Sequence, residues 1–121
     1  MLIRKLSECD DIVAGDGTRL RELLHPEREY PFGGRYSLAW ALLEPQSVSR
    51  KHRLDCSEVY YILSGTGEMH INDEIALVEA GDAIDIPPGS VQWIRNIGST
   101  DLIFLCIVDP AWTAENDTAL E

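Results

Sequence analysis

The sequence has few cysteines, few basic residues and no long apolar run, and each shortage excludes a class of protein. Its three cysteines, Cys9, Cys56 and Cys106, are odd in number and have no CxxC spacing, so we do not expect a disulfide framework. The longest apolar stretch, 102–108, is far too short to span a bilayer. The N-terminal residues lack the apolar segment of a signal peptide. We therefore expect a cytoplasmic protein in a reducing compartment.

Basic residues are outnumbered by acidic residues, 10 to 21, which gives a net charge of −11. This charge argues against nucleic acid or a membrane surface as the main partner. The length of 121 residues, with 45% hydrophobic and 26% charged residues, is typical of one compact domain. We expect a single domain over residues 1–112, followed by a polar, loosely held tail over residues 113–121.

What the sequence does contain is a series of short apolar segments separated by Gly, Pro, Asn and Asp. The predicted strands are residues 35–43, 57–63, 68–71, 75–80, 83–86, 91–94 and 102–108. Their even spacing predicts an all-β sandwich or barrel. The segment 17–27 fits a helix or a strand, and the β-rich surroundings favour a strand.

Alternation along residues 48–62 predicts which side chains share one face of the chain. That face carries Val48, Arg50, His52, Leu54, Glu58, Tyr60 and Ile62. A turn at residues 54–57 is expected to lay two strands side by side, so that His52 and Glu58 converge.

Two spaced motifs carry a resemblance to a known family. In the first, His52-x-Leu54 is followed by three residues, Glu58, six residues and Gly65. In the second, Gly81 precedes five residues and Pro87-x-Gly89, then two residues, Gln92, three residues and Asn96. Over residues 35–108, with motifs at about 45–65 and 81–96, the sequence resembles the cupins. The resemblance implies a double-stranded β-helix, or jelly roll, with a site in the barrel mouth.

The resemblance also implies a metal site, in which two of the four usual positions are changed. The family's two histidines, glutamate and third histidine correspond here to His52, Leu54, Glu58 and Gln92. Leu54 cannot bind a metal, and the Gln92 amide is a weaker ligand than imidazole. The site predicted from the resemblance is a divalent Mn²⁺, Fe²⁺, Ni²⁺ or Zn²⁺ ion on His52, Glu58 and Gln92, with no organic cofactor.

Four further residues are candidates for binding a small molecule. Arg50 shares a face with His52 and has the planar guanidinium that suits an anionic group, although a solvated rim is the alternative. Leu54 is expected to line the pocket, and Tyr60 is expected to fill the core, with a place in the pocket wall as the alternative. Cys56 lies within the motif, where a small side chain buried in a turn is the simpler interpretation.

These residues leave three functions open. The first is a protein that binds a divalent metal and a small, anionic molecule, with or without enzymatic activity. The second is a metal-free module for binding or sensing a small molecule, which Leu54 and Gln92 favour. The third is a metal-free isomerase or epimerase with His52 as its base.

Several residues outside the motifs have simpler interpretations. His25 is expected on the surface, and His70 is expected to face outwards without a role. Trp93 and Tyr61 are expected to face away from the pocket, where they are available to a second copy. We therefore expect a homodimer, which also follows from the resemblance and from the need to cover sheet edges.

Overall fold

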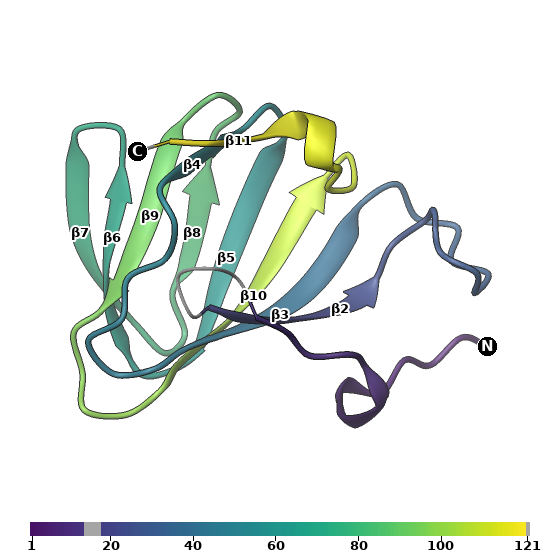
Figure 1. Ribbon diagram of the computed structural model, residues 1–121, viewed down its shortest axis with the longest axis horizontal. Coiled ribbons are helices and arrows are strands. Elements are labelled where there is room, and N and C mark those ends of the chain that lie inside the picture. The colour runs from purple at the N-terminus through teal and green to yellow at the C-terminus, as the bar shows by residue number, and fades with distance from the viewer. Residues whose placement is uncertain (14–17, 121) are drawn as a thin grey trace.

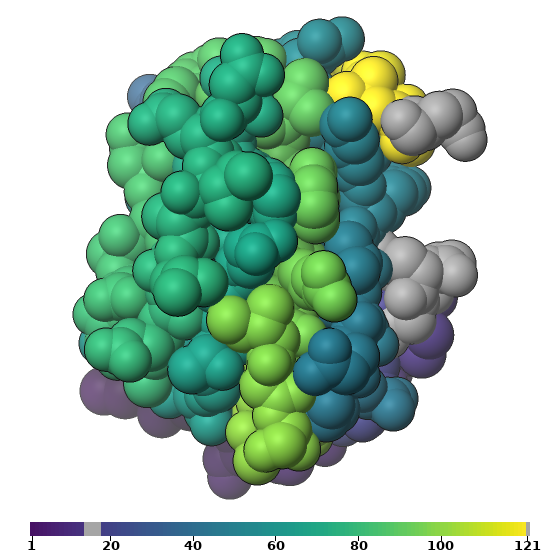
Figure 2. Space-filling view, turned by 90° about the vertical axis from the view of Figure 1, so that its left-hand side faces the viewer, coloured from purple at the N-terminus to yellow at the C-terminus, as the bar shows by residue number. Residues whose placement is uncertain are grey.

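The computed structural model describes residues 1–13 and 18–120, and in this part of the chain the strands form two facing antiparallel sheets (Figure 1). The strand order of the six-stranded sheet is β1 (Ile12–Val13), β2 (Arg19–Leu24), β3 (Ser37–Leu43), β10 (Leu102–Asp109), β5 (Ser57–Ser64) and β8 (Ala83–Ile86). The order of the five-stranded sheet is β11 (Asp117–Ala119), β4 (His52–Leu54), β9 (Val91–Asn96), β6 (Thr66–Ile71) and β7 (Glu74–Glu79). Figure 2 shows the outer face of the five-stranded sheet, with β7, β6, β9 and β4 side by side.

The predicted all-β jelly-roll fold is confirmed. Two 3-10 turns, η1 (Leu6–Glu8) and η2 (Ala114–Asn116), are the helical elements of the described chain, and no helix in it is long and apolar enough to cross a membrane. Each predicted apolar segment contains a strand. The ambiguous segment 17–27 forms β2 over Arg19–Leu24, while Gly17 lies outside the described residues.

One glycine of the first motif has a backbone position that other residues could not occupy. Gly65, between β5 and β6, has φ +91°, in the left-handed region. A Cβ atom there would lie 2.7 Å from the Asp101 backbone oxygen. The sharp turn from one sheet to the other therefore requires glycine at this position.

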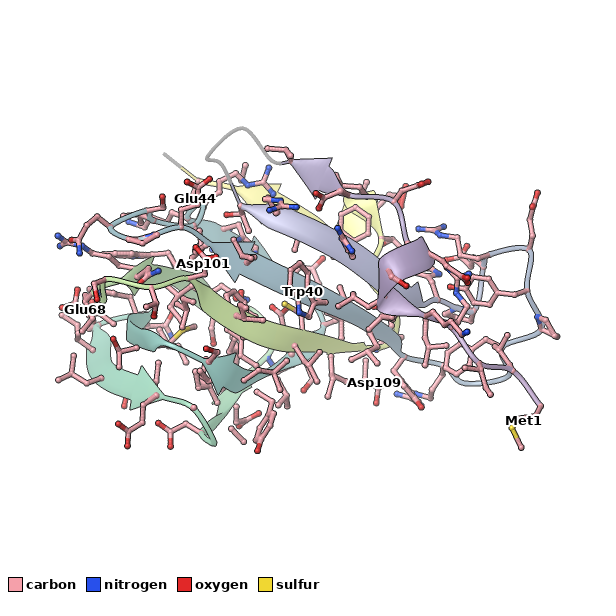
Figure 3. The ribbon with its side chains drawn as sticks, turned by 90° about the horizontal axis from the view of Figure 1, so that it is seen from below. Met1, Trp40, Glu44, Glu68, Asp101 and Asp109 are labelled. Atoms are coloured by element: carbon pink, nitrogen blue, oxygen red, sulfur yellow. The ribbon has the colours of Figure 1, made fainter. Side chains whose placement is uncertain are left out.

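The apolar core fills the space between the sheets at one end of the barrel. Leu43, Ile62, Ile94, Leu102 and Phe104 are fully buried there. Figure 3 labels Glu44 and Asp101 next to this end of β3 and β10, and Asp109 at the far end of β10. Alternation places the core residues of each strand on its inner face.

The expected pairing of the two motif strands is wrong. β4, which carries His52, pairs with β9 and β11, whereas β5, which carries Glu58, pairs with β10 and β8. The turn after Leu54 moves the chain from one sheet to the other instead of reversing it into a hairpin. Both residues still face the interior, because the two sheets face each other.

The C-terminal residues are not loosely held, contrary to the expectation from their composition. β11 pairs with β4, and Ala119 lies opposite His52. The Asp55 amide donates to the Asn116 carbonyl at 2.9 Å, and the Leu120 amide donates to the Lys51 carbonyl at 2.9 Å. Backbone pairing with a strand edge fixes this polar segment, and Glu121 lies outside the described residues.

The expected surface position of His25 is also wrong. His25 is 1% exposed. Its Nδ1 accepts the Glu27 amide at 3.1 Å, so Nε2 carries the proton and donates to the Trp112 carbonyl at 2.7 Å. The Trp112 amide in turn donates to the Ser37 hydroxyl at 3.0 Å. Two buried side chains therefore hold the segment that leads to β11.

His70 and Trp93 lie on the outer face of the five-stranded sheet, as their alternation predicts. The two rings are stacked with their centroids 3.4 Å apart, and His70 Nε2 is 2.7 Å from the Glu68 carboxylate. His70 is therefore engaged by two neighbours, although it has no part in the interior of the barrel.

Candidate functional site

A cavity of about 290 Å³ lies between the sheets and borders the packed core at Ala41, Tyr60 and Phe104, from which it extends towards the other end of the barrel. It forms because β3 and β10 carry smaller inner side chains here, namely Ser37, Ala39 and Cys106. Leu20, Leu54, Phe104 and Val108 are among the apolar residues in its wall. Its charged lining residues are Glu22, Arg50, His52, Glu58 and Asp117.

Most of the site residues predicted from the sequence line this cavity. Arg50, His52, Leu54, Glu58 and Tyr60 contribute to its wall. Gln92 and Cys56 are buried but are not among its lining residues. Cys56 packs instead with Leu54 and Val108, and burial raises the pKa of its thiol.

His52 is held in one orientation by the backbone of Arg50, two residues before it. Its Nδ1 lies 2.8 Å from the Arg50 carbonyl oxygen. Because a carbonyl can only accept, Nδ1 carries a proton, and in the neutral ring Nε2 is an acceptor. The arrangement leaves Nε2 for a ligand in the cavity that His52 lines.

Glu58, on β5, is a buried carboxyl group with an atom that lacks a partner. The residue is 5% exposed, and its Oε1 has no hydrogen-bond partner among the described residues. Burial raises the pKa of Glu58 to about 7, the side chain of Gln92 lowers it, and the charge of Asp117 raises it further. Near pH 7 the neutral and charged forms of Glu58 are therefore both populated.

Gln92, on β9, is engaged by Tyr60. The Tyr60 hydroxyl donates to Gln92 Oε1 at 3.0 Å, and Gln92 is 1% exposed. The Gln92 amide lies close enough to act on Glu58 as a hydrogen-bond donor that lowers the pKa of the carboxyl group, although in the described chain neither Gln92 Nε2 nor Glu58 Oε1 has a partner in full hydrogen-bond geometry. The carbonyl oxygen expected to bind a metal is thus already a hydrogen-bond acceptor.

Arg50 is neutralised by a residue that the sequence did not point to. Its Nη2 donates to Asp117 Oδ2 at 3.3 Å, and Trp112 Nε1 donates to the same oxygen at 3.1 Å. The Asp117 side chain is 10% exposed, and its Oδ1 is buried with no partner in the described part of the chain. The sequence did not predict Asp117 or Trp112 as residues of the site. Asp117 lies in a polar segment without a strand pattern, and the aromatic side chain of Trp112 was the one signal that this part of the chain contacts the rest.

Cys106 was also missed, although a signal for it existed. It follows the alternation of Phe104 and Val108 on β10, and all three residues line the cavity. Burial raises the pKa of its thiol well above the ordinary value. Cys106 is therefore a neutral, weakly polar part of the wall.

The side chains present do not form the donor set of a cupin metal site. The described residues contain no group of three His, Cys, Asp or Glu side chains that could hold a metal ion. With Gln92 Oε1 engaged by Tyr60, His52 and Glu58 are the two donors that remain of the predicted set. Catalytic metal sites in proteins use three protein ligands as a rule.

Sequence comparison shows which family and which known proteins the chain is similar to. Residues 39–108 match the cupin domain model. The uncharacterized protein MJ1618 of Methanocaldococcus jannaschii is 39% identical over 110 residues, which are 90% of this chain and 86% of that protein. An oxalate-binding protein of Thermotoga maritima is 41% identical over 51 residues, 42% of each chain.

Solved structures agree on the fold. The structure of a predicted oxalate decarboxylase from Thermotoga maritima has a TM-score of 0.76 at 29% identity, covering 88% of this chain and 97% of its own. The nucleoside dehydratase Pac13 from Streptomyces has a TM-score of 0.80 at 17% identity, covering 100% and 92%, and shows the fold alone. With these matches in sequence and in structure, the chain belongs to the cupin family.

Proposed function

We propose that this chain is a cupin that binds a small, largely apolar molecule in its cavity without a metal ion. The observation that carries the proposal is the hydrogen bond from Tyr60 to Gln92 Oε1. This hydrogen bond uses one lone pair of the Gln92 oxygen, Gln92 does not line the cavity, and Leu54 replaces a second family ligand. The polar groups that remain at the cavity are suited to hydrogen bonding a ligand.

The relatives named for oxalate do not lead us to propose oxalate for this chain. Oxalate is a dianion and needs a metal ion or free basic groups to hold it. Arg50, the expected anchor for an anion, pairs with Asp117. The buried Glu58 and Asp117 would also repel an anion in the cavity.

The test of the metal-free proposal is the metal content of the protein purified without an affinity tag or chelator, and again after incubation with Mn²⁺, Fe²⁺, Ni²⁺ and Zn²⁺. We expect far less than one metal ion per chain. The double variant Leu54→His, Gln92→His restores the family's ligand pattern and serves as a positive control, which should take up metal.

Near-stoichiometric metal in the wild-type protein that is lost in His52→Ala would overturn the proposal. That result would support the original set of His52, Glu58 and Gln92 as a divalent metal site. Circular dichroism of each variant separates the loss of a ligand from the loss of the fold.

A second candidate function, acid–base catalysis on the bound molecule, is supported by the position of His52 and the raised pKa of Glu58. His52 Nε2 would accept a proton from the substrate, and the protonated Glu58 would return one at a second position. An isomerase or epimerase needs such a pair. In deuterium oxide, we expect the wild-type protein to incorporate solvent deuterium into the molecule that copurifies with it, and we expect His52→Gln not to do so. If the wild type incorporates no deuterium, the protein binds the molecule without catalysis.

We also propose that two copies pair through the outer face of the six-stranded sheet. Trp40, Leu105 and Tyr61 lie in one row across β3, β10 and β5, and Tyr61 is 40% exposed. This uncharged row lets two chains of net charge −11 approach each other. Light scattering should give a dimer for the wild type and for Ile75→Glu on β7, and a monomer for Leu105→Glu; a wild-type monomer would contradict the proposal.

A further inference from the structure

Two carboxyl groups that line the polar end of the cavity each have one oxygen atom that lacks a hydrogen-bond partner. Glu58 Oε1 and Asp117 Oδ1 are both buried, and neither has a hydrogen-bond partner among the residues that the structure describes. In the neutral ring, His52 Nε2 is a third acceptor at the same cavity. Buried acceptors of this kind are rare in folded proteins, and each calls for a donor.

Several of the larger side chains that line the cavity direct hydrogen bonds to other protein groups. The Tyr60 hydroxyl donates to Gln92, and His52 Nδ1 donates to the Arg50 carbonyl. Arg50 Nη2 and Trp112 Nε1 both donate to Asp117 Oδ2. A ligand that brings its own N–H groups would therefore complete the site, whereas a ligand that brings only acceptors would not.

The balance of charge points the same way. Of the three acidic residues that line the cavity, Glu22 pairs with Arg28, and Asp117 shares one oxygen with Arg50. Glu58 is 5% exposed and has no cationic partner in the described chain, so the charge of its carboxylate form is not balanced by a neighbouring side chain. A cation from outside would satisfy the carboxylate form.

We propose that the ligand is an organic cation, a primary ammonium or an amidinium group on an apolar body, held between Glu58 and Asp117. This inference rests on the metal-free binding proposed above. A metal ion does not fit the same groups, because metal ligands must converge on one point and no three such side chains among the described residues do so. An organic cation directs several N–H groups outwards and spans a wider separation.

The rest of the cavity suits an apolar body. Leu20, Ala39, Phe104 and Val108 form its walls, and its volume of about 290 Å³ admits a group of the size of a benzene ring with a short side chain. The apolar part of the ligand would supply most of the affinity. The two carboxyl groups would discriminate a cation from a neutral or anionic ligand.

The test compares three probes of the same shape and different charge: benzylamine, benzyl alcohol and benzoate. Binding is measured by ligand-observed NMR titration with the wild-type protein at neutral pH. We expect benzylamine to bind at least about tenfold more tightly than either isostere, because a charge-assisted hydrogen bond in a buried site exceeds a neutral one.

Two variants and a control assign the effect to the cavity. Asp117→Asn should weaken benzylamine by about tenfold or more and should strengthen benzoate, because it frees Arg50. A purely structural role of Asp117 would weaken all probes alike. Asp85→Asn on the outer face of β8 makes the same change in net charge away from the cavity and should leave all three affinities unchanged.

Each other outcome is decisive. If benzyl alcohol or benzoate binds as well as benzylamine, and Ala39→Phe blocks that binding by filling the cavity, the charge inference is overturned while the proposed binding function stands. If no probe binds at millimolar concentration, the inference is wrong, and stoichiometric metal in the same protein would overturn the proposed function as well. If Asp117→Asn leaves the preference for benzylamine intact, Asp117 is not part of the site and the inference is wrong.

Discussion

The two ends of the barrel interior are built from the same strands and differ in what those strands carry. At one end, Leu43 on β3, Ile62 on β5 and Leu102 on β10 are fully buried against each other. At the other end, the same strands carry Ser37, Glu58 and Cys106, which line the cavity. Figure 3 shows the strands running from the end near Asp101 to the end at Asp109.

This difference separates the source of stability from the source of function. Close packing of large apolar side chains stabilises the fold at one end. At the other end, the side chains are smaller or polar and pack less closely, and two carboxyl groups there lack full hydrogen bonding. Sites for ligands in proteins are often built in this way, at some cost in stability.

The largest effect is expected at the packed end. Ile62→Ala removes a fully buried side chain and should lower the free energy of unfolding by about 4 kcal/mol. Cys106→Ala, on the cavity end, should cost less than about 1 kcal/mol, because its side chain already borders open space. Urea denaturation of both variants checks the contrast, and equal losses would show that the cavity end is packed as tightly as the core.

The next effect is a pH dependence at the cavity end. The pKa of Glu58 is about 7 in the folded protein and 4.5 in its ordinary state, so the folded protein holds a proton that the unfolded chain releases. The contribution of Glu58 to the free energy of unfolding is therefore highest below pH 4.5, falls as pH rises from 4.5 to 7, and levels off above. The total loss from this group is about 3 kcal/mol.

Glu58→Gln removes this proton and should remove its contribution to the slope. As pH rises from about 5, the free energy of unfolding of the variant should increase relative to that of the wild type. At alkaline pH the variant should be more stable by about 3 kcal/mol. The difference between the two proteins cancels the effect of the other carboxyl groups. A constant difference across this pH range would mean that Glu58 has an ordinary pKa in the folded protein.

A smaller effect is expected where the C-terminal segment closes the cavity end. His25→Ala removes the hydrogen bond to the Trp112 carbonyl and should lower the free energy of unfolding by about 2 kcal/mol. Hydrogen exchange should become faster in β11 and stay unchanged in β6. Faster exchange throughout the chain would show that His25 supports the whole fold instead of this segment.

The smallest effect is expected from filling the cavity. Ala39→Phe places a ring into open space and should change the free energy of unfolding by less than about 1 kcal/mol. The comparison change Val78→Phe, in the packed core and outside the cavity lining, should destabilise by about 3 kcal/mol through overpacking. Thermal unfolding of the pair measures the difference, and equal effects would contradict an open cavity.

The sequence was sufficient to predict the fold because the information is local. Alternating apolar residues and turn signals predict each strand, and Gly65 marks a turn whose backbone admits no other residue. The inward face of Arg50, His52, Leu54, Glu58 and Tyr60 also follows from alternation alone. The pairing of β4 with β9 instead of β5 could not be read from alternation, because both pairings direct the same side chains inwards.

The remainder of the site depends on contacts between distant segments. Asp117 reaches Arg50 only because β11 pairs with β4, 60 or more residues away in the chain. The short polar segment has no strand signal of its own, and its order comes from that partner and from His25. Likewise, the hydrogen bond from Tyr60 to Gln92 depends on how the two sheets pack together, and no spacing in the sequence predicts it.

The most direct test of a metal-free site is a carbon-13 NMR titration of the Glu58 carboxyl group, with and without excess Zn²⁺. We expect a pKa of about 7 in both conditions, since burial without a cationic partner sets the value. A pKa near or below the ordinary 4.5 that appears only with Zn²⁺ would show that a metal ion binds Glu58, and would contradict the metal-free site.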